Sequence, residues 1–146
     1  MIKFNEIMDA VEQAINNSPD IKTQNFTVTR SQYVNSDPQL VPWIGIYRNA
    51  INYNPHAMGR GANNWLSIVM VDIMVQSFDA DSGVNAEIKL EEHTDLILEI
   101  LEADRTLGGK VQQITGYELT YLVDENMTSD TYFQMVKITV TMEVRA

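Results

Sequence analysis

Apolar residues recur every three or four positions near the start of the chain. The stripe consists of Phe4, Ile7, Met8, Val11 and Ile15. A helix with 3.6 residues per turn would place these side chains along one side. Polar turn formers and a proline follow at residues 16–19, and proline cannot continue a helix. The pattern therefore predicts an amphipathic helix over residues 4–15 that packs through its apolar stripe.

Three strands are expected next. A short one lies near residues 24–30, and a second covers residues 41–47, where Pro42 indicates a sheet edge or a strand start. The third strand covers residues 65–76 and is longer. Its odd positions are mostly β-branched, and its even positions are also partly apolar. Both faces of this strand are therefore expected to be partly covered.

A long helix should follow, with Ser82 as its N-cap, and run for about twenty residues before Gly108 and Gly109. Apolar and polar residues then alternate over residues 111–123 and again over residues 136–144. These two segments are expected to form a hairpin connected by residues 124–131.

The expected order is α-β-β-β-α-β-β, without internal repeats or a linker between domains. This order predicts a single α+β domain over residues 1–146. We expect an antiparallel or mixed sheet of about five strands, with two helices packed on one face.

Composition narrows the functional classes. The chain has 146 residues, of which 45% are hydrophobic, and no apolar run approaches the ~20 residues of a membrane span. The first residues lack a secretory signal pattern. The absence of cysteine removes thiolate metal sites and cysteine nucleophiles. A formal net charge of −10 opposes general nucleic-acid binding, because phosphate affinity depends on many Lys and Arg contacts.

No catalytic motif stands out. The two histidines, His56 and His93, lack a recognisable nucleophile context, and a helix-face role is the simpler interpretation of His93. The run from Gly59 to Gly61 lacks the ending of a phosphate-binding loop. We therefore expect no enzyme activity, no cofactor and no metal site. A small acidic enzyme that uses paired carboxylates, or a ligand-binding domain, remains an alternative.

Four acidic residues repeat at i, i+4 along the long helix: Glu87, Glu91, Asp95 and Glu99. Each like-charge pair costs roughly 0.2 to 0.5 kcal/mol, so folding alone does not require the stripe. One interpretation is a solvated face on an acidic protein. The other is a surface that faces a basic partner or a channel that must not bind DNA.

A second unusual feature is the absence of Asp and Glu from residue 38 to residue 71. Part of this segment is an expected loop over residues 49–64, followed by an aromatic residue. Loops of this length are usually functional or disordered. The candidate partner-contact residues are Tyr53, His56, Met58, Arg60 and Trp65.

The whole chain resembles the tail terminator, or tail completion, proteins of long-tailed bacteriophages. The resemblance is carried by the sequence Leu-Glu-Ala-Asp-Arg-Thr-Leu-Gly-Gly-Lys-Val at residues 101–111 and by the last strand, residues 137–145. The first looks like the family's helix exit, where a Leu-Gly-Gly turn leads into the next strand. The Leu-Gly-Gly turn also has a local explanation, because glycine commonly closes helices.

This resemblance implies a structural virion protein that forms a homohexameric ring at the head-proximal end of the tail tube. Such a ring stops tube polymerisation and joins tail to head. Its partners would be other copies of itself, the tail tube protein and a neck or head-completion protein. DNA would pass through without specific binding, no membrane would be involved, and assembly would take place in the host cytoplasm. A head-completion connector is the main alternative.

A ring also requires a subunit interface and a lumen. Met70 and Met74 in the third strand are candidates for the interface, with ordinary burial inside one subunit as the alternative. An acidic lumen would let DNA pass, because carboxylates do not hold phosphates. We therefore expect part of the acidic stripe, or the loop residues Asp124, Glu125 and Asp130, to face the ring axis.

Overall fold

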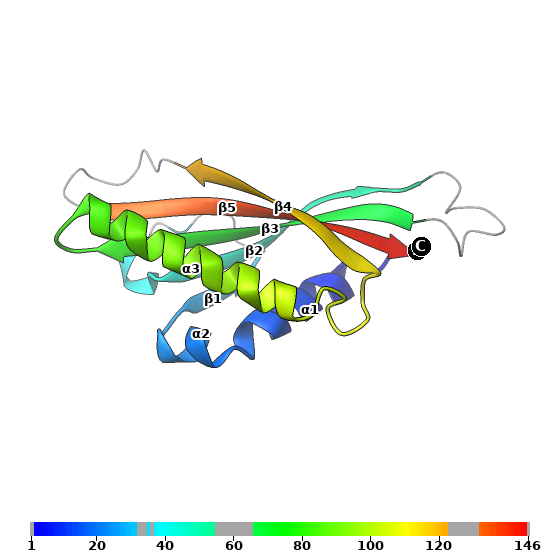
Figure 1. The fold of residues 1–146 in the computed structure, drawn as a ribbon, viewed down its shortest axis with the longest axis horizontal. Helices are drawn as coiled ribbons and strands as arrows, with labels where there is room; N and C mark the ends of the chain where they lie inside the picture. Colours follow the sequence, from blue (N-terminus) through cyan, green and yellow to red (C-terminus); the bar gives the residue numbers. More distant parts are fainter. Residues whose placement is uncertain (1, 32–34, 36, 55–65, 123–131, 146) are drawn as a thin grey trace.

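The fold is a mixed five-stranded sheet with three α-helices (Figure 1). This computed structural model describes residues 2–31, 35, 37–54, 66–122 and 132–145. The α+β class and the five-stranded sheet predicted from the sequence are confirmed. The expected order differs in detail, because the described residues contain a third helix and a short 3-10 turn, Pro38–Leu40.

Two helices open the chain. Helix α1, Phe4–Asn16, buries Ile7, Met8, Val11 and Ile15, as the apolar stripe predicted. Helix α2, Pro19–Thr23, was not predicted. Proline lacks an N–H and has a fixed backbone angle, and both properties suit the first position of a helix. Pro19 therefore begins a second helix at the place where the first one ends.

The strands are β1, Thr27–Arg30; β2, Trp43–Asn52; β3, Leu66–Asp79; β4, Gln113–Leu122; and β5, Tyr132–Arg145. Their order in the sheet is β1-β2-β3-β5-β4, so β1 and β4 are the edges. Only β1 and β2 pair in parallel among the described strands. The last two strands form the predicted antiparallel hairpin, and Pro42 stands just before an inner strand.

Strand β2 extends further than the sequence indicated. We expected a loop from residue 49, but residues 49–52 continue the strand, with a bulge at Asn49 between Arg48 and Ala50. The bulge lets Ile51 pair with Val69 and pack against the core. Burial of one more apolar side chain favours this extension, so the expected loop begins later than predicted.

Helix α3, Gly83–Ala103, crosses one face of the sheet (Figure 1). The side chain of Ser82 caps it and accepts a hydrogen bond from the backbone N of Asn85 at 3.4 Å, as expected for an N-cap. The same face of β3 buries its alternate residues Val69, Val71, Ile73 and Val75. These side chains join the apolar stripes of α1 and α3 in the main core.

The opposite face of β3 is covered in part by the subunit itself. Trp43, Met74 and Met135 form a small second cluster, and Met74 is only 1% exposed. Met70, which lies four residues earlier on the same face, is half-buried. Met74 therefore has almost no surface for a neighbouring subunit. It is buried on the face away from the helices, whereas the alternative interpretation placed it beneath them.

Candidate interaction surfaces

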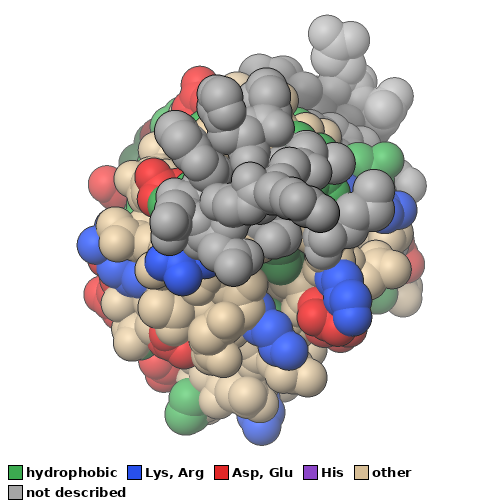
Figure 2. All heavy atoms as spheres, turned by 90° about the vertical axis from the view of Figure 1, so that its right-hand side faces the viewer, with side chains coloured by type: hydrophobic (Ala, Val, Ile, Leu, Met, Phe, Trp, Pro, Cys, Tyr) green, Lys and Arg blue, Asp and Glu red, His purple; other side chains and the backbone are tan. Residues whose placement is uncertain are grey.

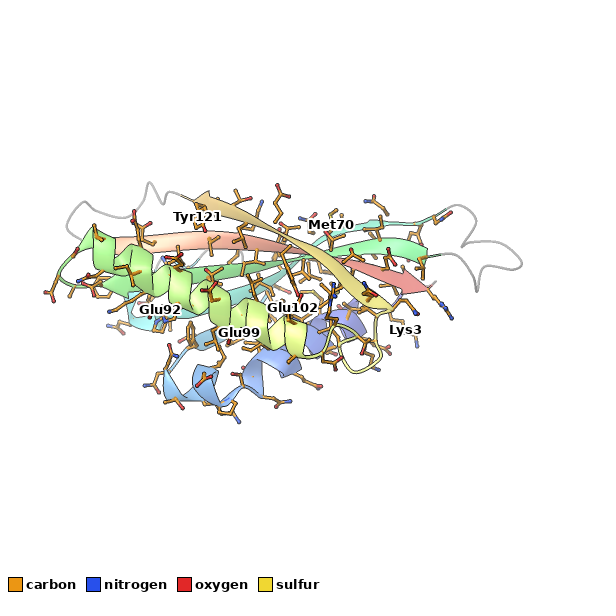
Figure 3. All side chains as sticks on the ribbon, in the orientation of Figure 1. Lys3, Met70, Glu92, Glu99, Glu102 and Tyr121 are labelled. Carbon is orange, nitrogen blue, oxygen red and sulfur yellow. The ribbon has the colours of Figure 1, made fainter. Side chains whose placement is uncertain are left out.

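The acidic stripe winds around α3. Glu87, Glu91, Asp95 and Glu99 are all exposed. Each step of four residues advances about 40° around a helix with 3.6 residues per turn. The stripe therefore starts beside β4, where Glu87 and Glu91 line a hollow. It ends at Glu99, which borders a different groove, facing α1 and α2 (Figure 3). One row in the sequence contributes to two separate surfaces.

An apolar patch with an acidic border lies where α3 begins and β4 ends. Its hollow, of about 370 Å³, is lined by Glu87, Leu90, Glu91, Tyr121 and Gln134. Tyr121 is 68% exposed on β4, and two apolar residues on the outer side of the same helical turns, Val84 and Ile88, are 64% and 48% exposed. We call Val84, Glu87, Ile88, Glu91 and Tyr121 the α3–β4 patch.

The carboxylates of this patch have no counterion among the described residues. Within the described parts of the chain, neither Glu87 nor Glu91 forms an ion pair. Apolar surface next to unpaired carboxylates resembles the composition of a contact surface, where an apolar centre is surrounded by polar groups.

A basic surface lies toward the other end of the sheet. Lys3, Lys110 and Arg145 line a hollow of about 240 Å³ together with Ile2, Ile7, Val144 and one acidic residue, Glu6. Figure 2 looks onto this end and shows several Lys and Arg side chains spread across it. We call Lys3, Lys110 and Arg145 the basic end. Lys3 lies 3.8 Å from Glu6, whereas Lys110 and Arg145 form no ion pair among the described residues.

A third surface is the groove between α3 and the first two helices, with a volume of about 440 Å³. Its apolar lining includes Ala14, Leu96 and Ile100. Asp20, Glu99 and Asp104 also border it, and no Lys or Arg is among its described lining residues. The carboxylate of Asp104 accepts hydrogen bonds from Thr106 and Gly108, which hold its pKa below the usual range. The groove is therefore negatively charged.

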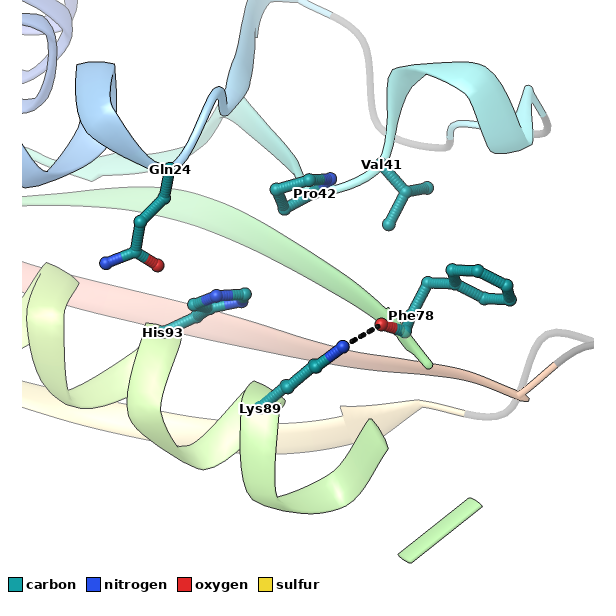
Figure 4. Close-up of a pocket in the computed structure, with 6 residues that line it drawn as sticks. All are labelled: Gln24, Val41, Pro42, Phe78, Lys89 and His93. Atoms are coloured by element: carbon teal, nitrogen blue, oxygen red, sulfur yellow. Dashed lines mark hydrogen bonds between the residues drawn. The ribbon is translucent and has the colours of Figure 1, made fainter. Parts of the chain in front are cut away.

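The predicted helix-face histidine is half-buried against the sheet. His93 Nδ1 lies 2.6 Å from the hydroxyl of Ser77, and its ring meets the edge of Phe26. Burial is the largest cause that lowers its pKa, and Lys89 adds to it, although Glu92 acts in the opposite direction. Figure 4 shows His93 beside Lys89, whose ammonium donates to the backbone O of Phe78.

This arrangement does not form a hydrolytic site. Ser77 is fully buried, so its hydroxyl cannot reach a substrate. A triad also needs a third group that orients the histidine, and His93 has no carboxylate hydrogen bond among the described residues. Within the same part of the chain, no group of three His, Asp or Glu side chains is close enough to hold a metal ion.

Asp72 is a buried acidic residue whose role the sequence analysis did not identify. It is 4% exposed, and its Oδ1 accepts hydrogen bonds from Asn49 at 2.9 Å and Thr139 at 2.8 Å. Asn49 stands in the bulge of β2, so the carboxylate ties the bulge to β3 and β5. A single acid within the otherwise apolar run of residues 68–75 was the signal that could have revealed this site.

Most of the candidate partner loop lies outside the described residues. This applies to His56, Met58, Arg60 and Trp65, and also to the predicted lumen residues Asp124, Glu125 and Asp130. Tyr53 is described and stands half-buried just after β2. The next residue donates its backbone N–H to the hydroxyl of Ser67 at 3.0 Å, so the chain leaves the sheet in a fixed position.

No family model matches this chain, and no curated protein matches its sequence. None of the described helices is both long and apolar enough to cross a membrane.

Proposed function

We propose that this protein is a tail terminator-like subunit of a long-tailed phage. In this role it forms a ring, of six subunits in the related family, at the head-proximal end of the tail tube. The ring stops polymerisation of the tube and provides the surface that joins tail to head. The protein has a structural role and performs no chemistry.

The observation that carries the proposal is the order of the elements around the helix exit. The long helix α3 ends in a turn in which Leu107, Gly108 and Gly109 all have positive φ angles, and the chain then enters the closing hairpin. This is the Leu-Gly-Gly exit that the resemblance to tail terminators rests on.

The surface properties also support assembly over catalysis. The described hollows are open to solvent, and several large apolar side chains remain exposed near the sheet edge β4. Exposed apolar patches and free sheet edges are features that a neighbouring subunit can cover. A ring provides such a neighbour for every copy.

Negative-stain imaging of the purified protein, alone and with tail tubes from the same phage, tests the proposal. We expect rings that sit at one end of each tube and tubes that no longer grow. Binding to capsid portals instead of tubes would favour a head-completion connector. A monomer that binds neither structure would overturn both forms of the proposal.

A further inference from the structure

The α3–β4 patch exposes more apolar surface than an isolated subunit needs. Val84, Ile88 and Tyr121 are 64%, 48% and 68% exposed, although the same turn of α3 buries Leu90 to 3%. Single exposed apolar residues are ordinary, but a group of them beside a hollow marks a contact site. This patch therefore needs an occupant.

The border of the patch defines the charge of that occupant. Glu87 and Glu91 stand one helical turn apart and have no cationic partner among the described residues. Their mutual repulsion is relieved if a cation approaches both. The occupant should therefore present an apolar centre with Lys or Arg around it.

The chain itself has such a surface at the basic end. There Lys110 and Arg145 are unpaired within the described part of the chain, and Ile2 and Val144 supply apolar lining. Tyr121 and Lys3 lie toward opposite ends of the long axis (Figure 3). A subunit cannot join its own two surfaces, but it can join one of them to a second copy.

We propose that the α3–β4 patch of one copy binds the basic end of a second copy. Glu87 and Glu91 then face Lys110 and Arg145, while Tyr121 and Ile88 pack against the apolar lining of the basic end. Because the two surfaces differ, the contact is heterologous, and its repetition closes into a ring or grows into a filament. This inference rests on the proposed ring and identifies the contact that builds it.

Net charge supports a second copy as a selective occupant. Copies with a formal net charge of −10 repel one another at long range. Association then requires a local match of opposite charges, which the basic end and the acidic border of the patch provide. Charge complementarity thus favours this heterologous contact over contacts between like surfaces.

Charge reversal tests the contact. One variant carries Glu87→Lys and Glu91→Lys, and the other carries Lys110→Glu and Arg145→Glu. Sedimentation velocity at low salt should show the wild-type protein as a closed oligomer, and each variant should associate at least tenfold more weakly. In an equimolar mixture, the lysine-bearing patch of one variant can bind the glutamate-bearing end of the other. The unchanged patch and the unchanged basic end can also bind each other, so the mixture should recover the oligomer.

Matched controls reverse the same number of charges elsewhere. Lys22→Glu with Arg48→Glu changes the net charge as the basic-end variant does, and both residues are exposed. Asp20→Lys with Glu118→Lys matches the other variant in the same way. Both controls should assemble like the wild-type protein. If they dissociate to the same extent, net charge rather than this contact controls assembly, and the inference is wrong.

Cross-linking gives a second test that does not reverse any charge of the contact. The chain has no cysteine, so Gln134→Cys at the hollow of the patch and Glu6→Cys at the hollow of the basic end introduce the only thiols and leave the proposed contact residues in place. With a short bismaleimide, the double variant should give a ladder of covalent multimers up to the size of the ring. Each single variant should remain uncross-linked, because each heterologous contact then contains only one thiol. Dimers from a single variant would indicate that like surfaces meet, and would contradict the heterologous contact.

The outcomes separate this inference from the proposed function. If both charge-reversed variants still form rings on tail tubes, the assigned contact is wrong but the proposed ring is supported. If the wild-type protein is a monomer at all concentrations, the contact is also wrong, and capping of tubes then decides the function alone. Binding of the patch to a basic tube or neck protein, without self-association, would overturn the assignment of a second copy.

Discussion

The hydroxyl of Tyr117 donates a hydrogen bond of 2.7 Å to Glu102 Oε1 and so ties the edge strand β4 to the last turn of α3. Burial, followed by this contact with Glu102, raises the pKa of Tyr117 well above its ordinary value. The neutral phenol is therefore the form that the folded state favours. Its contribution to stability is present below a pH of about 10 and is lost as pH rises above that value.

Tyr117→Phe should lower the free energy of unfolding at pH 7 by about 0.5 to 1.5 kcal/mol, the usual range for one hydrogen bond. Between pH 9.5 and 11 the wild-type protein should lose stability faster than the variant, because only the wild type has this phenol to ionise. Urea denaturation at a series of pH values measures both effects. Parallel pH curves would show that Tyr117 ionises as freely in the folded state as in the unfolded one.

Gly109→Ala should lower the free energy of unfolding by about 1 kcal/mol, because the left-handed backbone conformation is less favourable by roughly this amount for a residue with a Cβ. Gly109 has a φ of 85°, and an added Cβ would meet no atom within 4 Å, so backbone strain is the only penalty. Gly116→Ala is the matched control, since its Cβ also meets nothing within 4 Å and its φ is not in that region. Equal stability of the two variants in urea denaturation would contradict the strained turn.

His93 should make the protein less stable in mild acid. Burial lowers its pKa, so the neutral imidazole is the form favoured in the folded state. The contribution of the neutral His93 to stability is present above the pKa of the unfolded state, about 6.5. It is lost as pH falls through the lower pKa of the folded state. His93→Gln should therefore flatten the loss of stability between pH 7 and pH 5. An NMR titration that places the His93 pKa at or above 6.5 would refute this.

The two halves of the acidic stripe should respond differently to charge reversal. Glu87 and Glu91 belong to the proposed contact between copies, whereas Asp95 and Glu99 remain candidates for an acidic lumen. Asp95→Lys with Glu99→Lys should permit ring assembly yet impair DNA delivery, most strongly at low salt where screening is weak. Phage infectivity and ring imaging measure the two effects separately. Normal delivery by this variant would leave Asp95 and Glu99 as solvated residues.

Arg60→Glu, combined with shortening of the segment around it, should leave the fold intact and abolish capping of tail tubes. The prediction follows from the length of that segment and its lack of acidic residues. Circular dichroism checks the fold, and imaging with tubes checks capping. A variant that still caps tubes would remove the segment from the list of partner contacts.

Periodic patterns revealed the elements but not how they come together. The stripe of α1 and the N-cap Ser82 are local features, and both were predicted correctly. Helix α2 was missed because Pro19 both ends one helix and begins another. Sheet order depends on pairings between distant segments, such as Ile51 with Val69, which periodicity does not encode.

The candidate surfaces were harder to predict than the fold. The acidic stripe was found as a row, but its division between two surfaces depends on which elements lie on either side of α3. Lys3, Lys110 and Arg145 are far apart in the sequence and meet only because β5 returns beside α1. The sequence around Tyr121 does not predict its exposure. Alternation shows which residues of an edge strand share a face, but not how far along the strand the helix covers that face.

Strands β3 and β5 pair residue for residue from Leu66 with Arg145 to Asp79 with Tyr132, without a register shift. Hydrogen bonds in an antiparallel ladder run across the strands, so a pull along them is resisted by all the bonds at once. The ladder runs along the long axis of the sheet (Figure 1), and Lys3 of the basic end and Tyr121 of the α3–β4 patch lie toward opposite ends of that axis (Figure 3). In a ring built through the proposed contact, this ladder would transmit force from one neighbouring subunit to the next.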